Sequence, residues 1–204
     1  MAYIVKELFP TLQGEGLQSG RKAIFLRFSG CNLWSGREQD RATATCTFCD
    51  TDFVDGTRYD DSASLSQAVD TLWSGTGPKW VVITGGEPAL QLDSPLIDAL
   101  HQKGFAVAIE TNGTKTLPSG LDWICVSPKA ETTLAVTQGD ELKLVFPQTS
   151  APPERFQSLA FSHFLLQPMD GPDQKRNTAL AANYCLAHPQ WRLSLQMHKL
   201  VGLP

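Results

Sequence analysis

Residues Trp80-Val81-Val82-Ile83-Thr84 form an apolar run that is followed at once by Gly85-Gly86-Glu87-Pro88. A short apolar run closed by a turn signal is typical of a strand that is buried on both faces, as in a parallel sheet. The paired glycines allow the backbone to approach a ligand closely, and Pro88 stiffens the turn. The carboxylate of Glu87 is placed to accept a hydrogen bond from an ammonium group. The stretch therefore predicts a parallel sheet with a binding site at the ends of its strands.

Other apolar runs along the chain predict further strands of the same sheet. They are Ala23–Phe28, Ala106–Glu110, Trp123–Val126, Leu142–Phe146 and Phe164–Leu166, with Arg192–Gln196 as a candidate edge strand. Three helices are expected between them: Leu65–Trp73 capped by Ser62, Leu96–Gln102 opened by Ser94-Pro95, and a third from Asp173 to about His188.

The early alternation of strands and helices indicates right-handed crossovers and a parallel sheet. A closed eight-unit barrel needs roughly 250 residues, which is more than the 204 residues of this chain. We therefore expect an α/β fold, a partial (open) parallel barrel of about six strands and three helices, in one domain over residues 1–204. Functional side chains should lie after the carboxyl ends of the strands.

The composition is that of a soluble globular chain, with 42% hydrophobic and 19% charged residues. A formal net charge of -4 argues against a broad surface for nucleic acid or membrane. No apolar run approaches the roughly 20 residues that span a bilayer, and residues 1–7 lack the layout of a signal peptide. A cytoplasmic location is therefore expected, in which the five cysteines should not form disulfides.

Three of the cysteines are clustered directly after the first predicted strand. Fourteen residues separate Cys31 from Cys46, and two separate Cys46 from Cys49. Three thiolates suit an iron–sulfur cluster with one open iron, but they also suit a structural zinc site or unrelated thiols. Cys125 and Cys185 lie in apolar surroundings and are predicted to be core thiols. The glycine turn after residue 84 favours the cluster without excluding zinc.

At this point the sequence resembles the radical S-adenosylmethionine superfamily and, within it, the 7-carboxy-7-deazaguanine synthases. The resemblance covers essentially the whole chain and is carried by Phe9–Gly16, Phe25–Leu33, Cys46–Thr51, Thr84–Pro88, Glu110–Gly113, Ser127–Lys129 and Gln167–Asp170. The usual superfamily spacing is C-x3-C-x2-C, whereas this chain carries a polar insert at 32–45 in the cluster-binding loop. Some members of the synthase family are similarly expanded.

The resemblance implies an activity and a set of cofactors. The family contracts a ring of 6-carboxy-5,6,7,8-tetrahydropterin to give 7-carboxy-7-deazaguanine and ammonia, on the way to queuosine and other deazapurines. It is a carbon–nitrogen lyase that uses a [4Fe-4S] cluster, S-adenosylmethionine and Mg2+, and it abstracts a substrate hydrogen with a 5′-deoxyadenosyl radical. The implied partners are the pterin, an electron donor such as flavodoxin or ferredoxin, and a second copy in a homodimer.

The resemblance also implies residue roles. Cys31, Cys46 and Cys49 would hold the cluster, and Thr51 the magnesium, with Asp50 as an alternative ligand. The residues implied at S-adenosylmethionine are Phe48, Gly86, Glu87, Ser127, Pro128, Lys129, Gln167, Pro168, Met169 and Asp170. Those implied at the substrate are Leu12, Gln13, Gly14, Arg27, Thr84 and Pro204, with Glu15, Glu110 and His198 as further candidates.

Arg27 stands out because it interrupts the apolar strand Phe25–Phe28. A buried arginine needs an anion partner, and its planar fork suits a carboxylate such as that of the substrate. The alternative is a structural ion pair with Glu15 or Glu110. Two other functions compete with the synthase: a glycyl-radical activating enzyme, which acts on a protein, and a non-catalytic zinc module. Arg27 and the Leu12–Gly16 block favour a small-molecule substrate.

Overall fold

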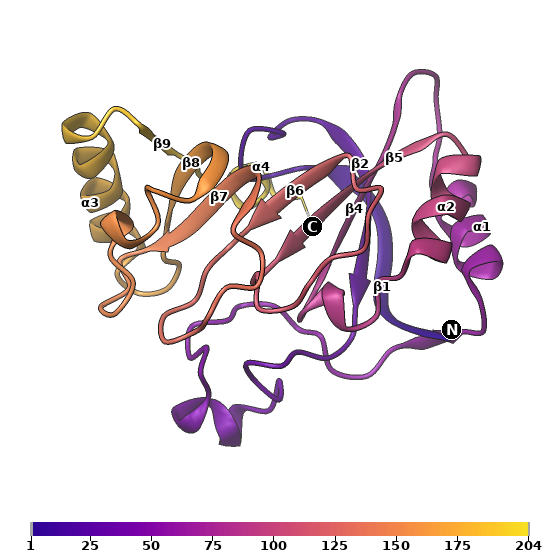
Figure 1. Cartoon of the computed structure of the whole chain (residues 1–204), viewed down its shortest axis with the longest axis horizontal. Coiled ribbons are helices and arrows are strands. Elements are labelled where there is room, and N and C mark those ends of the chain that lie inside the picture. The colour runs from indigo at the N-terminus through magenta and orange to yellow at the C-terminus, as the bar shows by residue number, and fades with distance from the viewer. Residues whose placement is uncertain (1, 204) are drawn as a thin grey trace.

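The computed structural model describes residues 2–203, and within them one open sheet runs through the molecule (Figure 1). Its nine strands lie in the order β3-β1-β2-β4-β5-β6-β7-β8-β9. The strands are β1 (Tyr3–Leu12), β2 (Lys22–Phe28), β3 (Thr57–Tyr59), β4 (Lys79–Gly85), β5 (Phe105–Thr111), β6 (Trp123–Val126), β7 (Gln138–Phe146), β8 (Ala160–Pro168) and β9 (Trp191–Leu193). The sheet is parallel from β2 to β9, and β1 is antiparallel to both its neighbours. The expected open, largely parallel α/β architecture is confirmed.

Helices cover the two ends of the sheet (Figure 1). The α-helices are α1 (Ser62–Leu72), α2 (Ser94–Gln102), α3 (Gln174–Ala187) and α4 (Met197–Val201), with short 3-10 turns η1 (Glu38–Thr43), η2 (Pro88–Leu90) and η3 (Pro153–Arg155). Helices α1 and α2 lie together at one end, and α3 lies at the other. The predicted cap of α1 was wrong: Asp61 precedes the helix in extended conformation and accepts from the Ser64 amide, whereas Ser62 is already helical.

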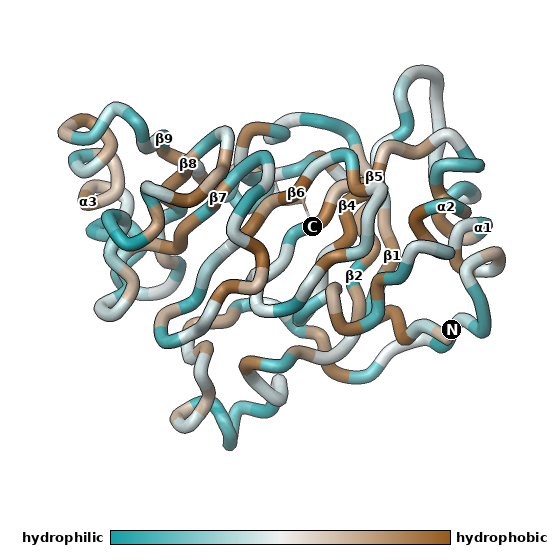
Figure 2. Tube along the Cα trace, in the orientation of Figure 1, coloured by the Kyte–Doolittle hydropathy of each residue, from teal (hydrophilic) through white to brown (hydrophobic). Residues whose placement is uncertain are grey.

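Alternation along the strands separates a helix-covered face from a second face. Leu26, Ile83 and Ile109 are fully buried and pack with α1 and α2. A second cluster around Leu144 and Trp191 packs beneath α3. Figure 2 shows this hydrophobic material concentrated in the central strands. Because successive residues of a strand point to opposite faces, the residues between these apolar positions point to the other face.

Three elements were not predicted. Strand β1 includes Pro10 and carries charged residues at Lys6 and Glu7, where its register with β2 shifts, so it has no continuous apolar run. Strand β3 has three residues, two of them exposed, and is recognisable only by its pairing with β1. Helix α4 is a five-residue turn that buries no side chain completely. Each of these elements forms through tertiary contacts rather than through local pattern.

No helix among residues 2–203 is both long enough and apolar enough to cross a membrane.

Candidate active site

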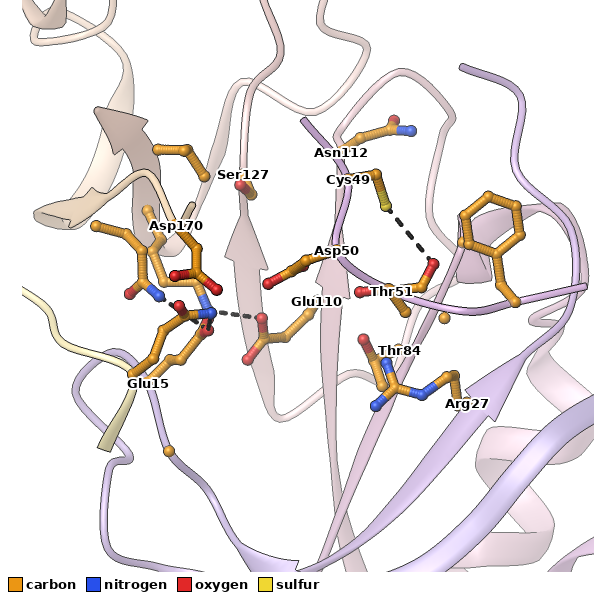
Figure 3. A pocket seen from close by; sticks show the side chains of 18 of the residues that line it. Glu15, Arg27, Cys49, Asp50, Thr51, Thr84, Glu110, Asn112, Ser127 and Asp170 are labelled. Atoms are coloured by element: carbon orange, nitrogen blue, oxygen red, sulfur yellow. Dashed lines mark hydrogen bonds and ion pairs between the residues drawn. The ribbon is translucent and has the colours of Figure 1, made fainter. Parts of the chain in front are cut away.

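A cavity of about 330 Å³ lies on the face of the sheet opposite α1 and α2. It is lined by strand ends from β1 to β8, by the loop that carries the clustered cysteines, and by α4 (Figure 3). Arg27 of β2 lies beside Thr84 of β4, since the two residues are paired across the parallel strands. Glu110 of β5, Lys143 of β7 and Gln167 of β8 line the same cavity. The expectation that functional side chains meet near the carboxyl ends of the strands is therefore met.

The three clustered cysteines all line this cavity as free thiols. Burial raises the pKa of Cys31 and Cys46, and each of these two thiols interacts electrostatically with the other and with Cys49. Within residues 2–203, no three His, Cys, Asp or Glu side chains converge closely enough to hold one metal ion. Three free thiols at one end of the cavity are, by their chemistry, a donor set that an iron–sulfur cluster with three protein thiolates would fit.

The glycine turn after β4 places the first cysteine. A Cβ at Gly86 would overlap the Gly30 carbonyl and lie 2.8 Å from the Cβ of Cys31. The Glu87 amide donates to the same Gly30 carbonyl at 2.9 Å. The two loops therefore pack backbone to backbone, which is possible because Gly86 has no side chain. The structure shows that this glycine turn approaches the cysteine loop closely, and its predicted approach to a ligand stays a prediction.

Glu87 does not line the cavity. Its side chain is completely buried, and its carboxylate accepts from the Thr111 hydroxyl at 2.6 Å and from the amides of Asn112 and Ala89 at 2.7 and 2.9 Å. Burial raises the pKa of this carboxyl, and the three donors oppose that shift. The Glu87 carboxylate therefore ties the turn after β4 to the end of β5. A carboxylate can accept about four hydrogen bonds, so the predicted hydrogen bond from a ligand ammonium stays a prediction.

Lys143 joins two carboxylates at the floor of the cavity. Its Nζ lies 2.6 Å from both Glu15 Oε2 and Glu110 Oε2, and only 4% of its side chain is exposed. Gln13 donates to Glu110 at 2.8 Å, and Gln167 donates to Glu15 at 2.8 Å. The segment after β1 and the strands β5, β7 and β8 are therefore held by one polar network (Figure 3). Lys143 was not predicted, although it interrupts an apolar strand as Arg27 does.

The charged groups of this network shift one another's pKa values. Burial alone would raise the pKa of the Glu15 carboxyl, but the Lys143 ammonium, with hydrogen bonds from Lys143 and Gln196, lowers it to about 2. Burial would likewise lower the pKa of Lys143, but the surrounding acidic groups, including Glu110 and Glu15, raise it well above its usual value. Glu15 is thus a carboxylate and Lys143 an ammonium group at neutral pH.

Arg27 has a partner that the sequence did not suggest. Its Nε lies 2.5 Å from Glu7 Oε1 on the neighbouring strand β1, not beside Glu15 or Glu110. The guanidinium lies next to Thr84 in the cavity (Figure 3). Within residues 2–203 no hydrogen bond occupies its two terminal nitrogens. Glu7 therefore orients the guanidinium and leaves its outer edge available to an anion.

The C-terminal segment lies over the cavity, which Gln196, His198 and Lys199 help to line. The Met197 amide donates to the Gly14 carbonyl at 2.8 Å, and the His198 ring packs so closely on Gly14 that a Cβ there would overlap it. Lys199 Nζ lies 2.8 Å from Asp50 and 2.5 Å from Asp170. Helix α4 is thereby tied to the loop after Cys49 and to the end of β8. Pro204 lies outside the described residues.

Lys129 stands close to the cysteine loop. Its Nζ donates to the Ser127 carbonyl at 2.7 Å and to the Ser127 hydroxyl at 2.8 Å. The pKa of Lys129 is lowered, because burial outweighs the opposing influence of the nearby Cys46 and Cys49. In its protonated form Lys129 places a positive charge at the thiol end of the cavity, where it would favour a negatively charged group.

Comparison with known proteins identifies the family. No protein-family profile matches the chain. The chain is 62% identical over 211 aligned residues to the 7-carboxy-7-deazaguanine synthase of Caulobacter vibrioides, and 61% identical over 211 to that of Bordetella pertussis, with 100% of both chains covered in each case. The chain belongs to the 7-carboxy-7-deazaguanine synthase family. The crystal structure of QueE from Escherichia coli is similar in fold, with a TM-score of 0.70, 30% identity, and coverage of 97% of this chain and 95% of that one.

Most residues predicted from the family resemblance do meet in the cavity of this synthase-family chain. They are Leu12, Gln13, Gly14, Glu15, Arg27, Thr84, Glu110 and His198 on the predicted substrate side, Phe48, Gly86, Ser127, Lys129, Gln167, Pro168, Met169 and Asp170 on the predicted cofactor side, and Cys31, Cys46, Cys49 and Thr51 for metal. Glu87 and Pro128 do not line it. Pro128 is buried, between two residues that do.

Replacing Glu87 with glutamine tests its structural role in the synthase. The amide would present NH2 to backbone and hydroxyl donors, so we expect E87Q to lower the free energy of unfolding by about 1–3 kcal/mol. Urea unfolding of the metal-free protein measures this loss, with E131Q on the surface as the control. Unchanged stability together with weaker S-adenosylmethionine binding would instead assign Glu87 to the ligand.

The lowered pKa of Glu15 predicts a pH dependence of stability. Because the folded-state pKa lies below the ordinary glutamate value of 4.5, Glu15 stabilises the fold fully above about pH 4.5, and this contribution is lost as the pH falls towards 2. The shift corresponds to up to about 3 kcal/mol. We expect the wild-type protein to lose more stability than E15Q between pH 6 and pH 3 in urea titrations. Equal losses would contradict the pairing, and D98N, at an exposed position, controls for general acid effects.

Proposed function

We propose that this chain contracts 6-carboxy-5,6,7,8-tetrahydropterin to 7-carboxy-7-deazaguanine with release of ammonia, as a carbon–nitrogen lyase of queuosine or deazapurine biosynthesis. The observation that carries the proposal is one cavity that joins three free thiols to an arginine with an open edge and a buried carboxylate–lysine network. This set provides a place for a soft metal cluster beside a place for an anionic, hydrogen-bonding small molecule.

The cofactor end of the cavity is proposed from donor chemistry. Cys31, Cys46 and Cys49 would hold a [4Fe-4S] cluster, leaving one iron for S-adenosylmethionine. When bound, the cluster and S-adenosylmethionine supply the radical that starts the reaction. Lys129 brings its positive charge to this end, and Phe48 between two ligands offers an aromatic face. Gly86 lets the turn after β4 pack directly against the cysteine loop, which brings this turn to the cofactor end of the cavity.

The remaining proposed cofactor contacts follow the strand ends. Ser127 comes after β6, and Gln167, Pro168, Met169 and Asp170 lie at the end of β8 and just beyond it. We place Mg2+ at Thr51, where substrate oxygens and water would complete a hard-oxygen site. Asp50 is the weaker candidate because one of its oxygens pairs with Lys199.

The substrate end is proposed from charge and hydrogen bonding. The outer edge of Arg27 suits the substrate carboxylate. The carboxyl groups of Glu15 and Glu110, with the amide of Gln13, offer acceptors to the amino and ring N–H groups of a pterin. Leu12, Gly14, Thr84 and His198 complete the wall, and Pro204 is proposed to reach the substrate from the chain end. Helix α4 limits access of water.

Further properties are proposed with the activity. We expect residues 1–204 to act as one domain, in a homodimer, in the cytoplasm, where a reducing environment keeps the free thiols competent for metal binding. Flavodoxin or ferredoxin is the proposed electron donor. Neither a nucleic acid nor a membrane is expected as a partner.

Anaerobic reconstitution tests the function. Protein loaded with iron and sulfide, then reduced and supplied with S-adenosylmethionine, Mg2+ and the carboxytetrahydropterin, should yield carboxydeazaguanine by mass spectrometry. Absence of product with a full cluster would refute the proposal. Colourless protein with one zinc per chain would support a zinc module, and hydrogen abstraction from a partner polypeptide alone would support a glycyl-radical activating enzyme.

A further inference from the structure

Leu33 and Trp34 of the polar insert at 32–45 line the cavity, but the rest of the insert has no role in the site described so far. The insert leaves the body of the molecule as a projecting loop that contains η1 and returns directly into Cys46 (Figure 1). A long excursion between two ligands of one cluster increases the entropy cost of bringing those ligands together. Contacts that fix the loop would therefore matter more here than in a short cysteine motif.

Arg41 of η1 makes such contacts with the second half of the cysteine loop. Its Nη1 donates to the Thr47 carbonyl at 3.1 Å and to the Cys49 carbonyl at 3.0 Å. These two peptide groups flank Phe48 and include one of the proposed cluster ligands. One guanidinium nitrogen thus bridges the turn that carries Cys46 and Cys49, while Nε of the same guanidinium pairs with Glu38. The fork of arginine allows both at once, whereas the single nitrogen of a lysine would have to serve both sets of partners.

Arg41 is itself held from two sides. Its guanidinium lies over the ring of Trp34, 4.0 Å from the centroid, and its Nε donates to Glu38 at 2.7 and 2.9 Å. Trp34 is 8% exposed and packs edge-on against Phe53, with ring centroids 5.5 Å apart. The guanidinium is therefore stacked on a side chain anchored in the core of the loop, which restricts its motion.

The guanidinium of Arg41 and the carboxylate of Glu38, which form an ion pair, are exposed to water to different extents. The Arg41 side chain is 28% exposed, whereas that of Glu38 is 78% exposed. Water screens the exposed carboxylate more effectively than it screens the guanidinium, which contacts the cysteine turn. A net positive influence on the thiol end of the cavity follows, and it adds to that of Lys129.

We propose that Arg41 is a positioning residue, through which the insert holds the Cys46–Cys49 turn in a cluster-binding conformation and raises the reduction potential of the bound cluster. The inference rests on the proposed function, since it requires the three thiolates to hold an iron–sulfur cluster. The two effects of Arg41 can be separated. Its hydrogen bonds fix the conformation of the Cys46–Cys49 turn, and its positive charge favours the reduced, more negative form of the cluster.

The test compares R41Q with R37Q, a matched control in the same insert. Both variants lose one positive charge from the insert. Arg37 is exposed, and its side chain makes no hydrogen bond or ion pair within residues 2–203, so R37Q removes the charge without removing a contact. In reconstituted protein we expect R41Q to lose cluster to a chelator about tenfold faster than wild type, the effect typical of a lost outer-shell contact. The midpoint potential, followed by electron paramagnetic resonance, should become more negative. R37Q should change both much less.

Two further variants separate charge from geometry. R41K keeps the charge but not the fork, so it should lose cluster faster than wild type with a smaller change in potential. E38Q keeps the hydrogen bonds of Arg41 to the carbonyls and removes a negative charge, so its potential should become less negative. In metal-free protein, amide hydrogen exchange over residues 46–50 should be faster in R41Q than in R37Q.

The outcomes distinguish this inference from the proposed function. Wild-type protein that binds no iron–sulfur cluster would refute the proposed site itself and this inference with it. A wild-type cluster, with R41Q matching R37Q in chelation rate, potential and exchange, would overturn only the role of Arg41. If R41Q does not fold, R41K tests the proposal instead. An R41K protein that loses its cluster to the chelator at the wild-type rate would overturn the positioning role of Arg41.

Discussion

The C46A protein is expected to retain its fold and to lose both the iron–sulfur cluster and ring-contraction activity. Cys46 is 4% exposed and stands at the end of the insert, on the wall of the cavity. Removing one of three thiolates leaves two protein ligands for a cluster that already has an open iron. We expect activity to fall by at least about 10³-fold, because the ligands act as one unit with the cofactor.

Iron and sulfide analysis, the visible absorption spectrum and the product assay measure this prediction together. The matched control is C185A on α3, where the thiol is half-buried beneath the second core cluster and outside the cavity. C185A should keep its colour and activity. A C46A protein with four irons per chain and normal turnover would show that Cys46 is not a ligand.

Replacing Lys143 with methionine is expected to have the second largest effect. Methionine fills similar volume, but it leaves the carboxylates of Glu15 and Glu110 next to each other in a largely buried site without their shared cation. Breaking a buried ion pair in this way costs about 3–5 kcal/mol. The same loss removes the orientation of both carboxylates towards the cavity, so the KM for the pterin should rise as well.

Urea unfolding of the metal-free protein measures the stability of K143M, and steady-state kinetics measure the KM. The matched control is K79M, which removes a strand lysine 2.5 Å from Asp70 at a site where the side chains are 30% and 25% exposed. That pair should contribute no more than about 1 kcal/mol. Equal losses in the two variants would contradict the central role of Lys143.

Much of the fold could be predicted from local pattern. The strands β2, β4 and β6 coincide with apolar runs to within one residue at each end, and α2 begins at the predicted Ser94-Pro95. The helix cap at Asp61 was missed because an acidic residue and a serine are adjacent there, and both are good caps. Strand β1 was missed because its pairing, rather than its own hydrophobicity, makes it a strand.

The site was predictable where a role depends on a motif and unpredictable where it depends on a distant partner. The cysteines, the glycine turn and Arg27 can be recognised in the chain itself. The partner of Arg27 was not, since Glu7 becomes adjacent only through the register of β1 on β2. Glu87 was assigned to a ligand because its motif lies at a strand end. Two of the three groups that donate hydrogen bonds to its buried carboxylate come from the end of β5, and the motif gave no sign of them.

Strand periodicity and motif spacing are local properties of the chain, so the parallel α/β sheet, the cysteine set and the family could be recognised from the order of residues alone. Three roles emerge only in the folded chain: Lys143 neutralises Glu15 and Glu110, Glu87 ties the turn after β4 to the end of β5, and Arg41 binds the cysteine turn. These roles depend on which strands are neighbours and in what register they pair. Hydrogen bonds and ion pairs act over about 3 Å, so groups far apart in sequence acquire such roles only when the sheet brings them together.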